Sequence, residues 1–313
     1  MAEEFCDVGR GITLCYETFG ERSNPTALLI MGLATQMIAW HDDFCRELAS
    51  RELYVVRFDN RDVGRSTHLT GPPPTIPQLV RRSRRAAQYT LRDMADDAAG
   101  LLRQLDLAPA HVIGASMGGM IAQGLAANHP QLVRSLVSIM SNTGRITSGQ
   151  PRLRTYPALL RQTPEGRDEF IAHVQSVFTA IGSRTLAADL DELRDLIERS
   201  YDRDHDPRGA GRQLAAIIAS GDRTRELRTI TAPTLVIHGT ADPLVRPSGG
   251  RATARAIPGA KLLLIRGMGH DLPRAVWPQI IDAIVENAAR ASVAAQAPAA
   301  PAAGAPAPSA ASA

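Results

Sequence analysis

The sequence predicts an α/β protein in which helices cover a mostly parallel sheet. Apolar, β-branched runs alternate with stretches of helical periodicity, the pattern of successive strand–helix units. The opening segment "VGRGITLCYETFG" alternates more and contains glycine, which suits an antiparallel hairpin at the sheet edge. Strand-like runs then disappear between about residues 143 and 226, which predicts an all-helical insert between two strands.

The composition is that of an ordinary globular protein. The 313 residues are 44% hydrophobic and 21% charged, with a net charge of only +3. We therefore expect no polyanionic partner such as nucleic acid, and the arginine run Arg81–Arg85 is interpreted as a solvated helix face. No apolar run is long enough to span a membrane and no signal peptide is visible, so the expected location is cytoplasmic.

The elements can be placed in order along the chain. Six apolar runs predict the parallel strands, at residues 26–32, 53–59, 111–115, 135–141, 233–239 and 261–267. Helical stripes predict helices over residues 91–105 and 117–129, and a last helix over 271–291. Asp271 is its expected N-cap, with Pro273 in the first turn.

The insert is predicted to be a cap over the carboxyl ends of the strands, where ligands bind in open α/β sheets. One helical stripe consists of Phe170, Val174, Val177, Phe178 and Ile181, and its first four residues are expected to line the substrate pocket. A second stripe consists of Leu186, Leu190, Leu193, Ile197 and Tyr201, and a third helix lies near 207–220. The predicted division is a core of residues 1–142 and 227–293, a cap of 143–226 and a disordered Ala/Pro-rich tail of 294–313.

One serine lies where a nucleophile is expected. Ser116 stands in the G-A-S-M-G segment of residues 114–118, directly after an apolar strand and before a helix. Glycines two residues before and two after the serine allow the sharp turn of a nucleophile elbow, which exposes the hydroxyl at the top of a sheet. The alternative is a tight turn that tolerates any small residue.

A serine nucleophile needs a base and an orienting carboxylate, in the chain order acid and then histidine. Asp242 follows the strand that ends at Gly239, and His270 follows the strand that ends at Gly267. Order, spacing and strand-end position all favour these two residues.

The remaining candidates fit less well. His111 begins a strand at the wrong end of the sheet, and His238 lies inside a strand. His68 belongs to a loop near the expected mouth, where contact with substrate is a minor alternative. Asp59 and Asp62 are expected to order their own loop. The three cysteines form no metal-ligand pattern, so we expect buried free thiols and neither a metal nor a cofactor.

An oxyanion needs two N–H donors. One is predicted to be Met117, the residue after the serine, and the other Leu33, with Gly32 allowing the backbone to approach. Val245, just after the predicted acid, and Gly32 are further candidates for the pocket lining.

These segments together resemble the serine α/β-hydrolases, in particular the esterase branch that includes aclacinomycin methylesterase-like and mycobacterial carboxylesterase-like proteins. The resemblance rests on "IMGLATQMIAWHDDFCREL", "VVRFDNRDVGRST", "YTLRDMADDAAGLL", "HVIGASMGGMIAQ", "LVIHGTADPLV" and "GMGHDLP". It implies an α/β-hydrolase fold, with Ser116 as nucleophile, His270 as base and Asp242 as its orienting acid. Many relatives have His-Gly where this chain has Met31-Gly32, but the N–H donor at Leu33 remains.

The leading hypothesis is hydrolysis of a small-molecule carboxylic ester through an acyl-enzyme, by a monomer or homodimer. Acyl transfer, perhydrolysis or C–C bond hydrolysis on the same triad are alternatives. A non-catalytic ligand receptor is disfavoured because none of the three triad positions is broken.

Overall fold

The computed structural model describes residues 2–75, 77–78, 86–155, 157, 164–186 and 189–296. Its centre is an eight-stranded sheet with the strand order β1-β2-β4-β3-β5-β6-β7-β8. The strands are β1 (Glu4–Asp7), β2 (Thr13–Phe19), β3 (Thr26–Ile30), β4 (Tyr54–Phe58), β5 (Ala110–Ala115), β6 (Val133–Ile139), β7 (Thr234–Gly239) and β8 (Lys261–Ile265). All six predicted parallel strands are confirmed.

The predicted edge hairpin is confirmed as well. Strands β1 and β2 pair antiparallel with each other, and β2 pairs antiparallel with β4, whereas all later pairings are parallel. Cys6 and Cys15 lie on this hairpin but are not register partners, and all three cysteines are free and buried.

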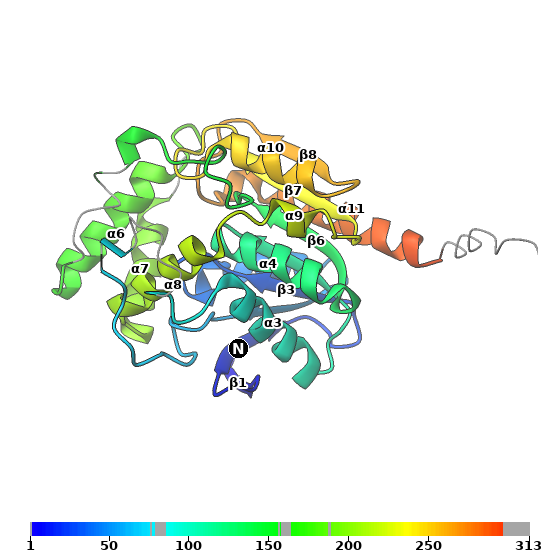
Figure 1. Ribbon diagram of the computed structural model, residues 1–313, viewed down its shortest axis with the longest axis horizontal. Helices are drawn as coiled ribbons and strands as arrows, with labels where there is room; N and C mark the ends of the chain where they lie inside the picture. Colours follow the sequence, from blue (N-terminus) through cyan, green and yellow to red (C-terminus); the bar gives the residue numbers. More distant parts are fainter. Residues whose placement is uncertain are drawn as a thin grey trace, which may run out of the picture.

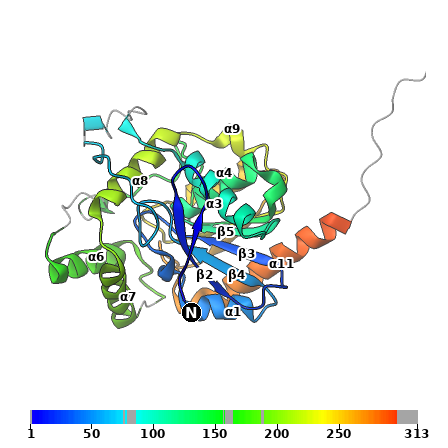
Figure 2. The ribbon, with the colours of Figure 1, turned by 90° about the horizontal axis from the view of Figure 1, so that it is seen from below.

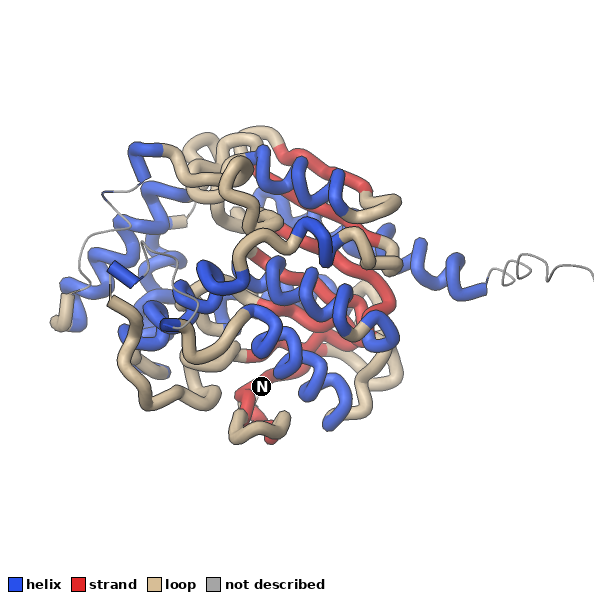
Figure 3. The backbone as a smooth tube through the Cα atoms, in the orientation of Figure 1, coloured by secondary structure: helices blue, strands red, loops and turns tan. Residues whose placement is uncertain are grey.

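Two layers of helices cover the sheet (Figures 1 and 3). The helices are α1 (Asp42–Ala49), α3 (Leu91–Gln104), α4 (Met117–Asn128), α6 (Arg167–Ile181), α7 (Leu190–Arg203), α8 (Pro207–Ser220), α9 (Thr224–Leu227), α10 (Pro247–Ala256) and α11 (Trp277–Gln296); short 3-10 turns are η1 (Met37–Ala39), η3 (Pro130–Leu132), η4 (Leu153–Thr155) and η5 (Arg274–Val276).

Both faces of the central strands are buried, which explains their uninterrupted apolar runs. In β3, Leu28 and Ile30 join the hydrophobic core that contains α3 and α4. Ala27 and Leu29, which alternate with them along the strand, join the core on the opposite face, which contains α1 and α11. None of the described helices combines the length and apolar character needed to cross a bilayer.

Helices α6, α7 and α8 lie together at one end of the sheet, away from the end toward which α11 extends (Figures 1 and 2). They follow β6 and precede β7 in the chain, as predicted for the cap. Helix α7 begins at Leu190, so Leu186 of the predicted second stripe precedes the helix, and Leu190 itself is 50% exposed. The arginine run Arg81–Arg85 lies outside the described residues.

The predicted start of the last helix is wrong. Helix α11 begins at Trp277, after the 3-10 turn η5, and Asp271 caps neither element. The physical reason is Pro278, which has no N–H to donate and favours the first turn of a helix. At its other end α11 continues to Gln296, three residues past the expected core boundary, and residues 297–313 lie outside the described residues.

Candidate active site

The turn that carries Ser116 has the geometry of a strained elbow. Ser116 joins β5 to α4 with φ of +56°, a left-handed conformation that costs a residue other than glycine about 1–3 kcal/mol. A Cβ atom on Gly114 would lie 2.1 Å from the carbonyl oxygen of Gly118, and one on Gly118 would lie 2.1 Å from that of Ile30. Both glycines are therefore required where helix, turn and strand meet.

Three polar side chains from three different strand ends meet at this elbow. His270, which follows β8, has its Nε2 3.0 Å from Ser116 Oγ and its Nδ1 2.8 Å from Oδ2 of Asp242, which follows β7. A carboxylate can only accept a hydrogen bond, so Nδ1 carries the proton and Nε2 is free to accept from the serine hydroxyl. Ser116, His270 and Asp242 thus form a continuous hydrogen-bonded chain.

Asp242 is held rigidly and stays ionised. Its side chain is completely buried, and its Oδ1 accepts hydrogen bonds from the backbone N–H groups of Leu244 and Val245, each 2.9 Å long. Burial alone would raise the pKa of this carboxyl, but the charge of His270 and the hydrogen bonds from His238 and His270 lower the pKa to about 2.

His238 is a second histidine beside the Asp242 carboxylate. Its Nε2 donates to the backbone oxygen of Val245 at 2.7 Å and lies 3.5 Å from Asp242 Oδ2. His238 is fully buried, which agrees with its predicted position inside a strand. Val245, predicted as pocket lining, is 7% exposed and contacts Asp242 through its N–H.

The loop after β3 lies directly beside the serine. A Cβ atom on Gly32 would be 3.2 Å from Ser116 Cβ and 3.7 Å from its Oγ. The loop is fixed by Asn60 Nδ2, which donates to Met31 O at 3.0 Å, and by Ala34 N, which donates to Gln213 of the cap at 2.8 Å. Within the described ranges, neither Leu33 N–H nor Met117 N–H donates to a protein acceptor.

The predicted pocket residues of the cap lie along α6. The ring of Phe170 packs inside the cap, with its centroid 5.2 Å from that of Tyr201 and 4.5 Å from that of His205. Val174, Val177 and Phe178 are partly buried on the same helix. The end of α6 reaches the loop that carries His270, because the backbone N–H of His270 donates to Ile181 O at 2.9 Å.

Asp59, in the loop after β4, makes hydrogen bonds and an ion pair that order this loop, as predicted. Asp59 accepts from the backbone N–H groups of Met37 and Arg65, and it pairs with Arg203 of the cap. His68, the minor candidate for substrate contact, instead lies 3.3 Å from Asp204 and 3.2 Å from Asp206.

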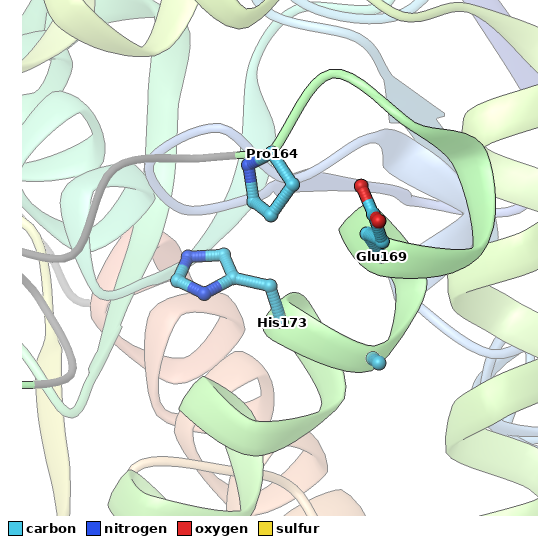
Figure 4. Close-up of a pocket in the computed structure, with 4 residues that line it drawn as sticks. Pro164, Glu169 and His173 are labelled. Atoms are coloured by element: carbon cyan, nitrogen blue, oxygen red, sulfur yellow. The ribbon is translucent and has the colours of Figure 1, made fainter.

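A separate pocket lies on the cap and is lined by Pro164, Glu169, Ala172 and His173 (Figure 4). Glu169 and His173 extend from the first turns of α6, and none of Ser116, Asp242 and His270 lines this pocket. In the part of the chain that the structure describes, no three His, Cys, Asp or Glu side chains are grouped so as to hold a metal ion.

Comparisons with known proteins agree with this architecture. The chain is 28% identical over 303 residues to the rhodomycin D methylesterase DauP of Streptomyces sp. strain C5, which covers 90% of this chain and 97% of that protein. It is 29% identical over 180 residues to a pimeloyl-[acyl-carrier protein] methyl ester esterase of Neisseria meningitidis, covering 57% of this chain and 68% of that one.

Solved structures show the same fold. A thermophilic esterase from Thermogutta terrifontis superposes with a TM-score of 0.70 at 21% identity, over 93% of this chain and 99% of that chain. The sequence model described as "alpha/beta hydrolase fold" matches residues 25–273, which is most of the chain and includes all three strand-end residues of the site. The chain therefore belongs to the α/β hydrolase fold family.

Proposed function

We propose that this hydrolase cleaves carboxylic esters through an acyl-enzyme formed on Ser116. The observation that carries the proposal is the continuous hydrogen-bonded chain from Ser116 through His270 to Asp242. Relatives named as methyl ester hydrolases, such as DauP and the Neisseria meningitidis esterase, support esters as the substrate class.

In the first half-reaction, Ser116 Oγ attacks the acyl carbon while its proton passes to His270 Nε2. The N–H groups of Leu33 and Met117 bind the oxyanion of the tetrahedral intermediate. The bond to the alcohol then breaks, and His270 returns the proton to the departing oxygen. Asp242 holds the imidazole in the required tautomer and stabilises its positive form.

In the second half-reaction, water replaces the alcohol. It attacks the acyl carbon and gives a proton to His270, and Ser116 leaves with that proton as the carboxylic acid forms. Each step uses groups of the chain and water alone. Apolar Val and Phe side chains on α6 favour an apolar acyl group or ring of modest size as the substrate.

Mutation of the triad tests the assignment of roles. Ser116→Ala and His270→Ala should each lower kcat for p-nitrophenyl acetate by about 10⁶-fold, because either change disables the same unit. Asp242→Asn should cost less, about 10⁴-fold, because it disturbs the histidine tautomer without removing the base. Retained turnover in Ser116→Ala, or full kcat in Asp242→Asn, would contradict the assignment.

Covalent labelling provides an independent check. An organophosphonate should modify Ser116 in the native protein and leave His270→Ala unmodified, since the serine then lacks its base. Ser50→Ala is a suitable control, because Ser50 is exposed at the end of α1 and its loss should leave labelling unchanged. Labelling of a different serine would overturn the proposal.

A further inference from the structure

The loop that carries His270 is held from the cap as well as from the core. On the core side, Ala241 N–H donates to Met268 O at 3.0 Å, and Asp242 binds the imidazole. On the cap side, the segment of residues 181–183 lies directly against residues 269–271. The cap therefore reaches the backbone of the proposed base itself.

Four hydrogen bonds join these two segments. His270 N–H donates to Ile181 O at 2.9 Å. Gly269 N–H donates to Ser183 Oγ at 2.8 Å, and the Ser183 hydroxyl in turn donates to Asp271 Oδ1 at 2.6 Å. Ser183 N–H donates to Asp271 Oδ2 at 2.9 Å. Ser183 and Asp271, which we call the cap clamp, thus bind each other twice, and Ser183 also binds Gly269, the residue before His270.

The packing around the clamp leaves little freedom. A Cβ atom on Gly269 would lie 2.3 Å from the carbonyl carbon of Gly182 and 2.5 Å from Ser183 N. One on Gly267 would lie 2.5 Å from Thr185 Oγ1. The two backbones touch because glycine occupies the contact positions, so a displacement of the cap segment would be transmitted to His270.

We propose that Ser183 and Asp271 are positioning residues that hold His270 between Ser116 and Asp242. The inference rests on the proposed role of His270 as the base. Asp271 is not an alternative acid of the triad, because both of its oxygens accept from Ser183 while Asp242 Oδ2 faces the imidazole. The orientation of the base consequently depends on the cap being docked at the end of α6.

Kinetics of clamp variants test this role in the full chain. Ser183→Ala and Asp271→Ala should each lower kcat for p-nitrophenyl acetate by about 10²-fold, the loss expected from misplacing a catalytic group by about 1 Å. KM should change little, because neither side chain is proposed to touch the substrate. The double variant should lose no more than the more damaging single variant, since both changes break one unit.

Two further variants serve as matched controls. Arg274→Gln removes another contact between the cap and the core, the ion pair of Arg274 in η5 with Glu192, whose side chains are 47% and 32% exposed. Arg274 lies three residues beyond Asp271. The Arg274→Gln variant should keep wild-type kcat. Ser183→Thr retains a hydroxyl and should restore part of the activity that Ser183→Ala loses.

A spectroscopic signature separates positioning from folding. The proton on His270 Nδ1, hydrogen-bonded to Asp242, should give a low-field ¹H resonance that weakens or broadens in Ser183→Ala while the melting temperature stays near that of the wild type. Wild-type kcat together with an unchanged resonance in Ser183→Ala would overturn the proposed positioning role. If Ser183→Ala does not fold, Asp271→Asn, which keeps the shape and one acceptor oxygen, decides by the same readouts.

Failure of the clamp and failure of the proposed function are distinguishable. An active Ser116→Ala would remove the serine mechanism whatever the clamp variants do. An inactive Ser116→Ala beside fully active clamp variants would remove only the positioning role.

Discussion

Single glycines of helix α4 differ sharply in what they tolerate. At Gly118 an added Cβ would lie 2.1 Å from the backbone oxygen of Ile30, whereas at Gly124 the nearest atom would be Ala95 Cβ at an ordinary 3.5 Å. We therefore expect Gly118→Ala to lower the free energy of unfolding by at least about 2 kcal/mol through overpacking. Gly124→Ala should raise it by up to about 1 kcal/mol, because alanine favours helix.

Urea unfolding of both variants measures the difference. The two changes are chemically identical and lie in the same helix, so each is the control for the other. Equal stabilities would mean that the close approach of α4 to β3 at the elbow relaxes without cost.

At the level of residues, the sequence predicts the polar side chains that follow strands, but it does not predict the hydrogen bonds that join the cap to the loop of His270. Ser116, Asp242 and His270 can be placed because each follows an apolar run at a strand end. Ser183 carries no such signal, since its partner Asp271 is 88 residues away in the chain. The sequence predicts Asp271 as the N-cap of the last helix, because an acidic residue two positions before a proline, here Pro273, is typical of a helix start.

At the level of elements, the central strands are predictable because both of their faces are buried, which leaves uninterrupted apolar runs. Helix α10 (Pro247–Ala256) was not predicted, because its sequence "PSGGRATARA" contains two glycines and lacks large apolar residues. Glycine at position 250 allows α10 to pack closely against β7, because a Cβ atom on Gly250 would lie 2.5 Å from His238 Nδ1.

Helices α7 and α8 are joined by a segment that binds His68. The hydrogen bond to Asp204 raises the pKa of His68 to about 9; burial opposes this, and Gly64 O and Asp206 add to it. The folded pKa thus exceeds the unfolded value of about 6.5, so protonated His68 stabilises the fold fully below about pH 6.5 and loses this effect toward pH 9.

The melting temperature of the wild type should accordingly fall more steeply between pH 6.5 and 9 than that of His68→Gln. Comparing the two proteins cancels the groups that titrate in both. Parallel curves would show that His68 does not couple protonation to folding.

The two halves of helix α6 should contribute differently to substrate choice. Val177 and Phe178 lie within about a turn of Ile181, which contacts His270, whereas Phe170 packs against Tyr201 inside the cap. Phe178→Ala should shift the preferred acyl chain length by about 10-fold in relative kcat/KM, with a smaller effect on acetate esters.

A series of p-nitrophenyl esters of increasing chain length measures this preference. Phe170→Ala is the matched control and should lower thermal stability rather than change the preferred length. Uniform loss across all esters in Phe178→Ala would mean that this side chain only supports the fold.

At the level of the whole molecule, buried ion pairs join the cap to the loop after β4. Arg203 of α7 lies 2.7 Å from Asp59, and Arg212 of α8 binds Asp62 in two parallel contacts of 2.8 and 2.9 Å. All four side chains are at most 7% exposed. Helices α7 and α8 are thus fixed to the core through their charges, while α6 meets the core at the cap clamp.

Removing one charge of the Arg212–Asp62 pair should therefore destabilise the protein strongly. Asp62→Asn keeps the side-chain shape, and asparagine tolerates the φ of +66° at this position, so the main change is an Arg212 that loses its closest counter-charge in the interior. The expected loss in the free energy of unfolding is about 3–5 kcal/mol, measured by urea denaturation. The double change Asp62→Asn with Arg212→Met should cost less than the sum of the single changes, because it also removes the buried guanidinium that has lost its closest counter-charge. Asp202→Asn, which breaks the exposed ion pair of Arg167 within the cap, is the control and should have little effect. If Asp62→Asn were equally mild, the Arg212–Asp62 pair would not anchor the cap, and other contacts, such as the hydrogen bond from Ala34 N–H to Gln213, would hold α8 on the core.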